Sequence, residues 1–301
     1  MVATRKLAGA PISWGVCEVP GWGRQLPPER VLSEMARLGL TATELGPAGY
    51  LPRDGAGILA ALEAHGLDLV GGFVPLVLHE HYARPALEQA ASTAATLAAA
   101  GADVFVAALV LDEAWSRPRP LDDAEFGRLV ENLAQVEAIA SAEGLTLALH
   151  PHWDTLIETA QDVDRLLAAT DTPWCLDTGH LLIGGVGPAN FVADHGDRIV
   201  HVHLKDVDEQ IAARLRGGEL TLVQATQAGL FRPLGQGDAG IEAVMRRLDR
   251  HGYARWLVLE QDTAITGDEP PVGSGPVVDV AKSIDFLNAL ALEEEETVAP
   301  Q

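Results

Sequence analysis

Short apolar runs alternate along the chain with longer amphipathic runs that are rich in alanine and leucine. The apolar runs predict strands at 7–15, 41–46, 67–78, 103–110, 145–150, 173–177, 198–206 and 256–262. The amphipathic runs predict helices at 27–39, 54–65, 85–101, 122–143, 159–170, 188–195, 240–252 and 276–292. Eight strands that alternate with helices predict a single-domain α/β fold, a (β/α)8 TIM barrel over residues 1–292.

Two segments depart from this alternation. Residues 207–237 are less regular and contain only a weak helical pattern, and residues 293–301 begin with four glutamates that predict a flexible acidic C-terminal tail. The alternative fold is a doubly wound open sheet. It is disfavoured because no GxGxxG motif follows the first strand and no linker divides the chain.

Composition and charge narrow the classes of partner. The 301 residues are 48% hydrophobic, which is enough for a large core without disulfides. The formal net charge of −22 repels phosphate backbones and anionic membranes, so neither nucleic acid nor a membrane is expected as a partner. With two cysteines, no signal-peptide pattern and no apolar run of ~20 residues, we expect a cytoplasmic protein.

Residues that can bind a metal stand where several predicted strands end. Asp177, His203 and Glu260 end the sixth, seventh and eighth strands, and His150 ends the fifth, with His152 just beyond it. The carboxyl ends of parallel barrel strands meet at one mouth, so these side chains are expected to converge there. Any one of them alone is more often a cap or a core residue. Their joint occurrence predicts a site for Mn²⁺, Co²⁺, Fe²⁺ or Zn²⁺.

Alternation along the seventh strand adds detail. His201, His203 and Lys205 share one face, and the position nearer the carboxyl end favours His203 over His201 as the ligand. Lys205 is expected at the mouth, either facing substrate oxygens or paired with Asp206. Gly179 allows the chain to turn so that the side chain of His180 can point back to the site, where it would transfer protons; the alternative role for His180 is to cap a helix.

Seven segments together resemble a known family. They are APISWG (10–15), TELGPAGYLP (43–52), HPHWDTLIET (150–159), CLDTGHL (175–181), HVHLKDV (201–207), PLGQGD (233–238) and HGYARWLVLEQD (251–262). The chain resembles the xylose isomerase-like TIM-barrel superfamily of sugar isomerases and epimerases, and within it the inosose dehydratases. The resemblance implies a divalent metal ion held by Asp177, His203 and Glu260. The fourth ligand position normally carries a glutamate, but here His150 stands there, with His152 as the alternative ligand.

The resemblance implies a metal-dependent hydro-lyase that removes water from a cyclic keto-polyol such as scyllo-inosose through an enolate. Mn²⁺ or Co²⁺ is the expected ion, with Zn²⁺, Fe²⁺ or Mg²⁺ as alternatives. Glu260, His150 or His152 is the candidate base, and His180 or Lys205 the candidate acid. The expected substrate-binding residues are Glu44, Lys205, Trp14 and Trp153, although core packing is the commoner fate of tryptophan.

Three other functions compete with this hypothesis. A metal-dependent isomerase or epimerase of keto-sugars would share the fold and metal, but a histidine in place of one of its two carboxylates favours elimination. A metal-dependent endonuclease is disfavoured by the net charge. A non-enzymatic binding protein would not need Asp177, His203 and Glu260 at one mouth. A homo-oligomer is expected from the resemblance alone.

Overall fold

Nine strands form one parallel sheet among residues 5–298, which are those that the computed structural model describes; side chains are described for residues 5–292. The strands follow the order β3-β2-β1-β11-β8-β7-β6-β5-β4 around the sheet. Their bounds are β1 Lys6–Gly9, β2 Ala42–Thr43, β3 Asp68–Leu69, β4 Gly71–Leu76, β5 Val104–Leu109, β6 Thr146–Leu149, β7 Trp174–Asp177, β8 Ile199–Leu204 and β11 Trp256–Leu259. Two further strands, β9 Asp206–Val207 and β10 Phe231–Arg232, form a small antiparallel pair.

The sheet closes on itself at Val70. The predicted strand 67–78 is divided there into β3 and β4, which pair with β2 and β5 respectively. Val70 donates its N–H to Thr43 O at 2.9 Å and accepts from Val104 N at 3.1 Å, so one segment carries both ends of the sheet. The fold is therefore the predicted single-domain TIM barrel rather than an open doubly wound sheet.

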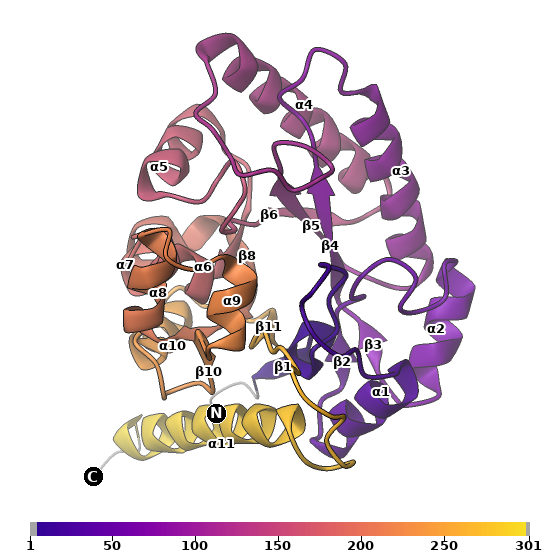
Figure 1. The fold of residues 1–301 in the computed structure, drawn as a ribbon, viewed down its shortest axis with the longest axis vertical. Coiled ribbons are helices and arrows are strands. Elements are labelled where there is room, and N and C mark those ends of the chain that lie inside the picture. The colour runs from indigo at the N-terminus through magenta and orange to yellow at the C-terminus, as the bar shows by residue number, and fades with distance from the viewer. Residues whose placement is uncertain (1–4, 299–301) are drawn as a thin grey trace.

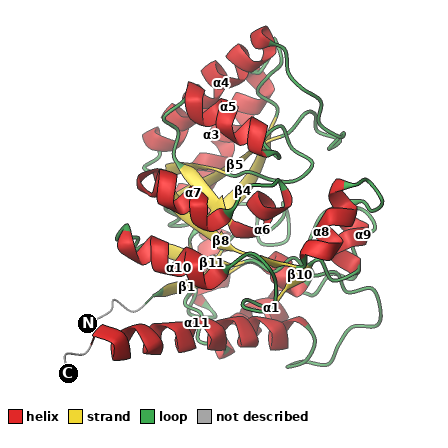
Figure 2. Ribbon diagram, turned by 90° about the vertical axis from the view of Figure 1, so that its left-hand side faces the viewer, coloured by secondary structure: helices red, strands yellow, loops and turns green. Residues whose placement is uncertain are grey.

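Helices cover the outside of the barrel (Figure 2). Their bounds are α1 Pro28–Arg37, α2 Gly55–Glu63, α3 Arg84–Ala99, α4 Asp123–Ala142, α5 Ala160–Ala169, α6 Thr178–Ile183, α7 Pro188–His195, α8 Glu209–Arg216, α9 Leu222–Gln227, α10 Ile241–Arg250 and α11 Pro276–Val298. The last helix, α11, runs along one end of the molecule near β1 (Figure 1). None of the helices within the described part of the chain is long and apolar enough to cross a membrane.

Local sequence explains where several helices begin. Asp122 accepts the N–H of Glu125 while the Glu125 side chain accepts the N–H of Asp122, and this capping box starts α4. Thr159 and Asp162 form the same arrangement at α5. The apolar faces of these helices then pack on the barrel, where Leu129, Leu133 and Val163 are almost fully buried.

Three further predicted segments differ from the structure. The first strand ends at Gly9 instead of residue 15, because Pro11 starts a 3₁₀ helix, Pro11–Trp14, that Gly15 ends with a φ of 84°. The irregular stretch 207–237 contains α8 and α9, which pack on a separate apolar cluster with Leu215 and Phe231. The predicted acidic tail at 293–301 is helical as far as Val298, and residues 299–301 lie outside the described residues.

Candidate functional site

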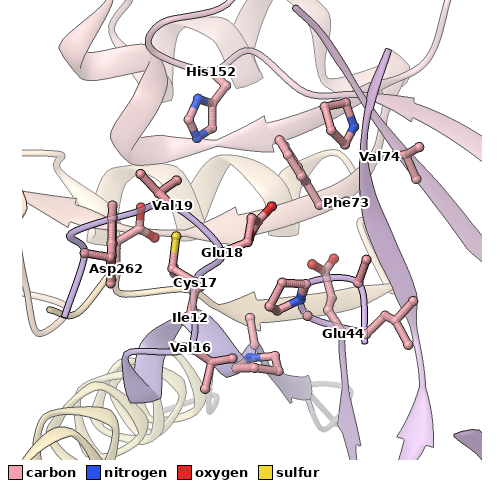
Figure 3. Close-up of a pocket in the computed structure, with 18 of the residues that line it drawn as sticks. Ile12, Val16, Cys17, Glu18, Val19, Glu44, Phe73, Val74, His152 and Asp262 are labelled. Atoms are coloured by element: carbon pink, nitrogen blue, oxygen red, sulfur yellow. The ribbon is translucent and has the colours of Figure 1, made fainter. Parts of the chain in front are cut away.

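A pocket of about 920 Å³ opens where the barrel strands end (Figure 3). Residues that follow four different strands line it, and they are Glu44 after β2, His150 after β6, Lys205 after β8, and Glu260 and Asp262 after β11. His152 and Glu44 project into this pocket from opposite sides (Figure 3). The barrel mouth therefore gathers residues from the whole length of the chain.

Four potential metal ligands converge beside the pocket. The ligand atoms of His150, Asp177, His203 and Glu260 all lie within 4.8 Å of one another, and all four side chains are buried. His203 Nδ1 lies 2.6 Å from Glu260 Oε2 and 3.0 Å from His150 Nε2. His150 Nε2 lies 3.3 Å from Asp177 Oδ2. We refer to these four residues as the ligand group.

The ligand group fits a divalent cation. Asp177 Oδ2 and Glu260 Oε2 are buried without a hydrogen bond of normal geometry to any described residue. Two carboxylate oxygens and two imidazole nitrogens form a mixed donor set that suits Mn²⁺, Co²⁺, Fe²⁺ or Zn²⁺. The smaller groups that include Cys175 or His201 share His203 with this set but offer only three ligands.

Glu44 contacts His203 at Nε2, the ring nitrogen that faces away from the ligand group. Its Oε1 lies 2.9 Å from His203 Nε2 and 2.7 Å from His201 Nε2. A proton on Nε2 that is donated to Glu44 leaves the Nδ1 lone pair of His203 facing the ligand group. Burial would raise the pKa of Glu44, but the imidazoles of His203 and His201 outweigh burial and lower it. Glu44 is thus held by histidines at the pocket wall, an arrangement that the substrate-binding prediction did not include.

Electrostatics at His203 also favour a cation. Burial disfavours the charged imidazole, but the neighbouring Cys175, Glu260 and Glu44 outweigh burial and raise the pKa of His203 well above its usual value. The negative charge that favours a proton at this position also favours a metal cation. His201 lies two residues before His203 on β8, and its Nε2 contacts Glu44 instead of the ligand group.

Lys205 is buried among acidic groups at the mouth. Its Nζ lies 2.7 Å from Asp262 Oδ1 and 3.2 Å from Glu260 Oε2. Burial would lower the pKa of Lys205, but Asp262, Glu260 and Asp177 outweigh burial and raise it. Lys205 therefore brings a positive charge to the pocket wall.

The suggested pairing of Lys205 with Asp206 was wrong. The Asp206 carboxylate accepts the backbone N–H groups of Gly235, Gly237 and Ala239 at 2.8–3.0 Å. Gly235 and Gly237 belong to the PLGQGD segment and Ala239 follows it, so Asp206 attaches this segment to the end of β8. Alternation explains the difference, because Asp206 follows Lys205 and points to the other side of the chain.

Two further histidines lie together beside the ligand group. The rings of His152 and His180 are 3.8 Å apart between centroids. His152 Nδ1 contacts Trp153 O, and the Trp153 N–H donates to His180 Nδ1 at 3.2 Å. Burial lowers the pKa of His152 to about 3 and that of His180 well below its usual value, so both rings are neutral near pH 7. His180 Nε2 lies 3.3 Å from Lys205 Nζ, which places His180 within reach of the site.

The two tryptophans that were predicted to bind substrate lie in different environments. Trp153 lines the pocket. Trp14 is fully buried, and its Nε1–H donates to Glu34 Oε2 at 2.9 Å. The prediction that Trp14 binds substrate is therefore wrong, because the 3₁₀ turn directs this side chain to the core beneath α1.

The sequence reasoning missed Asp262, Phe73 and Trp115. Asp262 stands two positions after Glu260, in the segment that follows β11, so the spacing that grouped His203 with Lys205 would have found it. Burial raises the pKa of Asp262 to about 6. Phe73 and Trp115 stack at 6.2 Å, and Trp115 lies 5.7 Å from His152. No local pattern indicates Trp115, because it lies in a loop with a φ of 55°.

Comparison with known families agrees with this architecture. The model of the xylose isomerase-like TIM barrel family matches residues 32–290. The chain belongs to this family. One member of the xylose isomerase-like TIM barrels, the inosose dehydratase of Geobacillus kaustophilus, is 31% identical over 274 residues, which are 85% of this chain and 87% of that protein. The rhizopine catabolism protein MocC of Rhizobium meliloti is 33% identical over 269 residues, which are 85% of this chain and 81% of that protein.

Solved structures show the same family fold. The IOLI protein with a bound zinc atom superimposes with a TM-score of 0.69 at 14% sequence identity, and the match covers 95% of this chain and 97% of that one. At 14% identity, the similarity between the two structures shows only a common fold. The evidence for a divalent metal site in this chain is the buried ligand group itself.

Proposed function

We propose that the chain is a metal-dependent hydro-lyase that removes water from a cyclic keto-polyol such as scyllo-inosose. The observation that carries this proposal is the ligand group at the barrel mouth, with Lys205 beside it. Relatives named inosose dehydratase, such as the one 31% identical over 85% of the chain, support the choice of substrate class.

His150, Asp177, His203 and Glu260 would hold the metal ion, and Mn²⁺ or Co²⁺ is the ion that we propose. When bound, a divalent cation would polarise the substrate carbonyl and stabilise negative charge on its oxygen. Trp153 and Lys205 line the same pocket and would position the ring beside the ligand group.

His152 is the base that the geometry favours, and its low pKa keeps the ring neutral near pH 7, so that an electron pair is available although the ring is a weak base. Glu260 and His150 belong to the ligand group, so their electron pairs are directed there, whereas His152 lies outside it. A proton on Nδ1 donated to Trp153 O leaves the Nε2 lone pair of His152 free. In this proposal His152 Nε2 takes the proton from the carbon beside the carbonyl, and the released electron pair forms the enolate.

Lys205 is the proposed acid. As the enolate reverts to a carbonyl, a carbon–carbon double bond forms and the bond to the β-hydroxyl breaks with both electrons on oxygen. Lys205 donates a proton to this oxygen, and water leaves. His152 gains one proton and Lys205 loses one, so solvent restores both and no oxidant or reductant is needed.

Elimination is favoured over isomerisation by the same geometry. A two-base epimerase requires a carboxylate on each face of the substrate, but the residue that follows β6 is His150 and not a glutamate. With Asp177 and Glu260 in the ligand group, His152 and Lys205 remain as a base and an acid of different type, which suits water loss.

Incubation of the metal-loaded protein with scyllo-inosose tests this proposal. Mass spectrometry is expected to detect loss of one water, with rising ultraviolet absorbance from the unsaturated product. His152→Gln is expected to lower kcat by about 100-fold with unchanged metal content. His81→Gln, at an exposed histidine, is the matched control. A product of unchanged mass, or no product with any of the candidate metals, would contradict the dehydratase proposal.

A further inference from the structure

Lys205 lies two residues after the last residue of β8 that pairs with β7. The last pair between these strands joins Asp177 to His203, after which the chain turns into α6. The backbone N–H and C=O of Lys205 therefore have no strand partner on this side. Left unsatisfied in the buried core, both groups would be costly.

The hydroxyl of Thr178 makes the hydrogen bonds that a neighbouring strand would otherwise make with Lys205. Thr178 Oγ1 accepts the N–H of Lys205 at 2.8 Å and donates to Lys205 O at 2.7 Å. Thr178 is fully buried, and Lys205 is 2% exposed. One side-chain oxygen thus fixes both backbone groups of the residue that carries the ammonium.

Gly179 provides a second and independent contact with Lys205. A Cβ atom at Gly179 would lie 2.7 Å from Lys205 Cβ and 3.3 Å from Lys205 Cδ. The backbone angle of Gly179 is not in the left-handed region, so it is the space beside Lys205 that requires glycine here. A side chain at this position would force a shift of the lysine stem or of Gly179 itself, and it would also press on Val207 Cγ2 at 3.2 Å.

We infer that Thr178 and Gly179 are positioning residues that hold the ammonium of Lys205 at the reacting end of the pocket. They fix the lysine backbone and stem, and Asp262 at 2.7 Å and Glu260 at 3.2 Å then orient Nζ. The DTGH segment accordingly has two functions. Asp177 belongs to the ligand group, and the next two residues place the proposed acid. This inference rests on the proposed function for its catalytic consequence only.

The position of the ammonium can be measured without substrate. The chain has three lysines, and Lys6 and Lys282 are exposed, so ¹⁵N-lysine labelling leaves one buried ammonium to observe. We expect a slowly exchanging ammonium signal that is missing in Lys205→Met. Thr178→Val should broaden or shift this signal, and Thr178→Ser, which retains the hydroxyl, should restore it. Thr226→Val removes another buried hydroxyl, one without a hydrogen-bond partner among the described residues, and should leave the signal unchanged.

Kinetics then test the catalytic consequence with a double-mutant cycle. Thr178→Val is expected to lower kcat by about 10- to 100-fold with little change in metal affinity, because small displacements of a reacting group cost that much. In the Lys205→Met background the same change should have almost no further effect, because Thr178 acts through Lys205.

An unchanged ammonium signal in Thr178→Val, or an effect on kcat that is fully additive with Lys205→Met, would overturn the inference. If Thr178→Val does not fold, Gly179→Ala replaces it, and an unchanged signal in that variant is equally contrary. If the wild-type protein removes no water from keto-polyols, the proposed function falls, while the ammonium signal still decides whether Thr178 positions Lys205.

Discussion

Glu44 determines which nitrogen of His203 faces the ligand group. Its Oε1 contacts Nε2 of both His201 and His203, so the carboxylate fixes the two rings with a single oxygen. A carboxylate behind a metal-binding histidine orients the ring and raises its basicity. Glu44 is therefore expected to contribute to metal affinity without contacting the ion.

Substitution of Glu44 by glutamine tests this role. Glu44→Gln retains the shape but removes the charge, and we expect metal affinity to fall by about 10- to 100-fold. Competition with a chelating dye measures the affinity, and Glu63→Gln at an exposed position on α2 is the control. Equal affinities for the wild type and Glu44→Gln would exclude this supporting role.

Individual residues were predictable where alternation along one strand decided their direction. His203 and Lys205 were grouped by alternation, and Asp262 has the same two-residue spacing from Glu260 after β11. Trp14 was not predictable, because its environment depends on Glu34 of α1, which hydrogen-bonds to it across twenty residues of sequence. A tryptophan near a strand end is thus ambiguous until the packing of the following turn is known.

At the scale of elements, Asp206 attaches a loop to the barrel. Its carboxylate accepts N–H groups from the PLGQGD segment, from Ala239 and from Val207, and Asp206 is 1% exposed. Asn in its place would direct an NH₂ group toward these donors. We predict that Asp206→Asn lowers the free energy of unfolding by about 2–3 kcal/mol.

Hydrogen exchange gives the local measurement for Asp206. The amides of Gly235, Gly237 and Ala239 should exchange faster in Asp206→Asn, while those within α10 remain protected. Urea unfolding gives the free energy, with the exposed Asp164→Asn as control. Unchanged protection of the three amides would show that the carboxylate does not hold the segment.

A second prediction at this scale concerns Glu158, at the end of the loop before α5. Burial raises the pKa of Glu158 to about 7 from 4.5, with Asp154 and Asp162 adding to this effect. Between these values the unfolded chain has released the proton that the folded chain still holds. The contribution of Glu158 to stability therefore decreases as pH rises from about 4.5 to 7, because the folded state binds more protons.

The melting temperature measured against pH checks this sign. Relative to the wild type, Glu158→Gln should gain in melting temperature as pH rises through this window, because it cannot ionise. The exposed Glu143→Gln should follow the wild type throughout. A wild-type profile parallel to that of Glu158→Gln between pH 4.5 and 7 would contradict the raised pKa.

Element prediction failed where distant contacts decide the structure. The strand at 67–78 is interrupted at Val70 because it pairs with β2 before that residue and with β5 after it, which local sequence does not encode. The helices α8 and α9 are short, and their stability comes from an apolar cluster that joins Leu215 of α8 to Phe231 of β10, rather than from a strong periodic pattern.

At the scale of the whole molecule, topology explains why the site was predictable at all. His150 and Glu260 are 110 positions apart in sequence, yet parallel strands in a closed barrel bring their ends to one mouth. Alternating strands and helices in the sequence predict that closure, and the ends of the strands then predict the ligand group. The loops that contribute Trp115 follow no such rule.

The central claim is that one divalent cation binds His150, Asp177, His203 and Glu260 at the barrel mouth. Anomalous diffraction from crystals of the Mn²⁺-loaded protein tests it most directly. We expect one strong anomalous peak within bonding distance of all four side chains, and loss of that peak in Asp177→Asn. A peak at another position, or an empty ligand group at saturating Mn²⁺, would contradict the account.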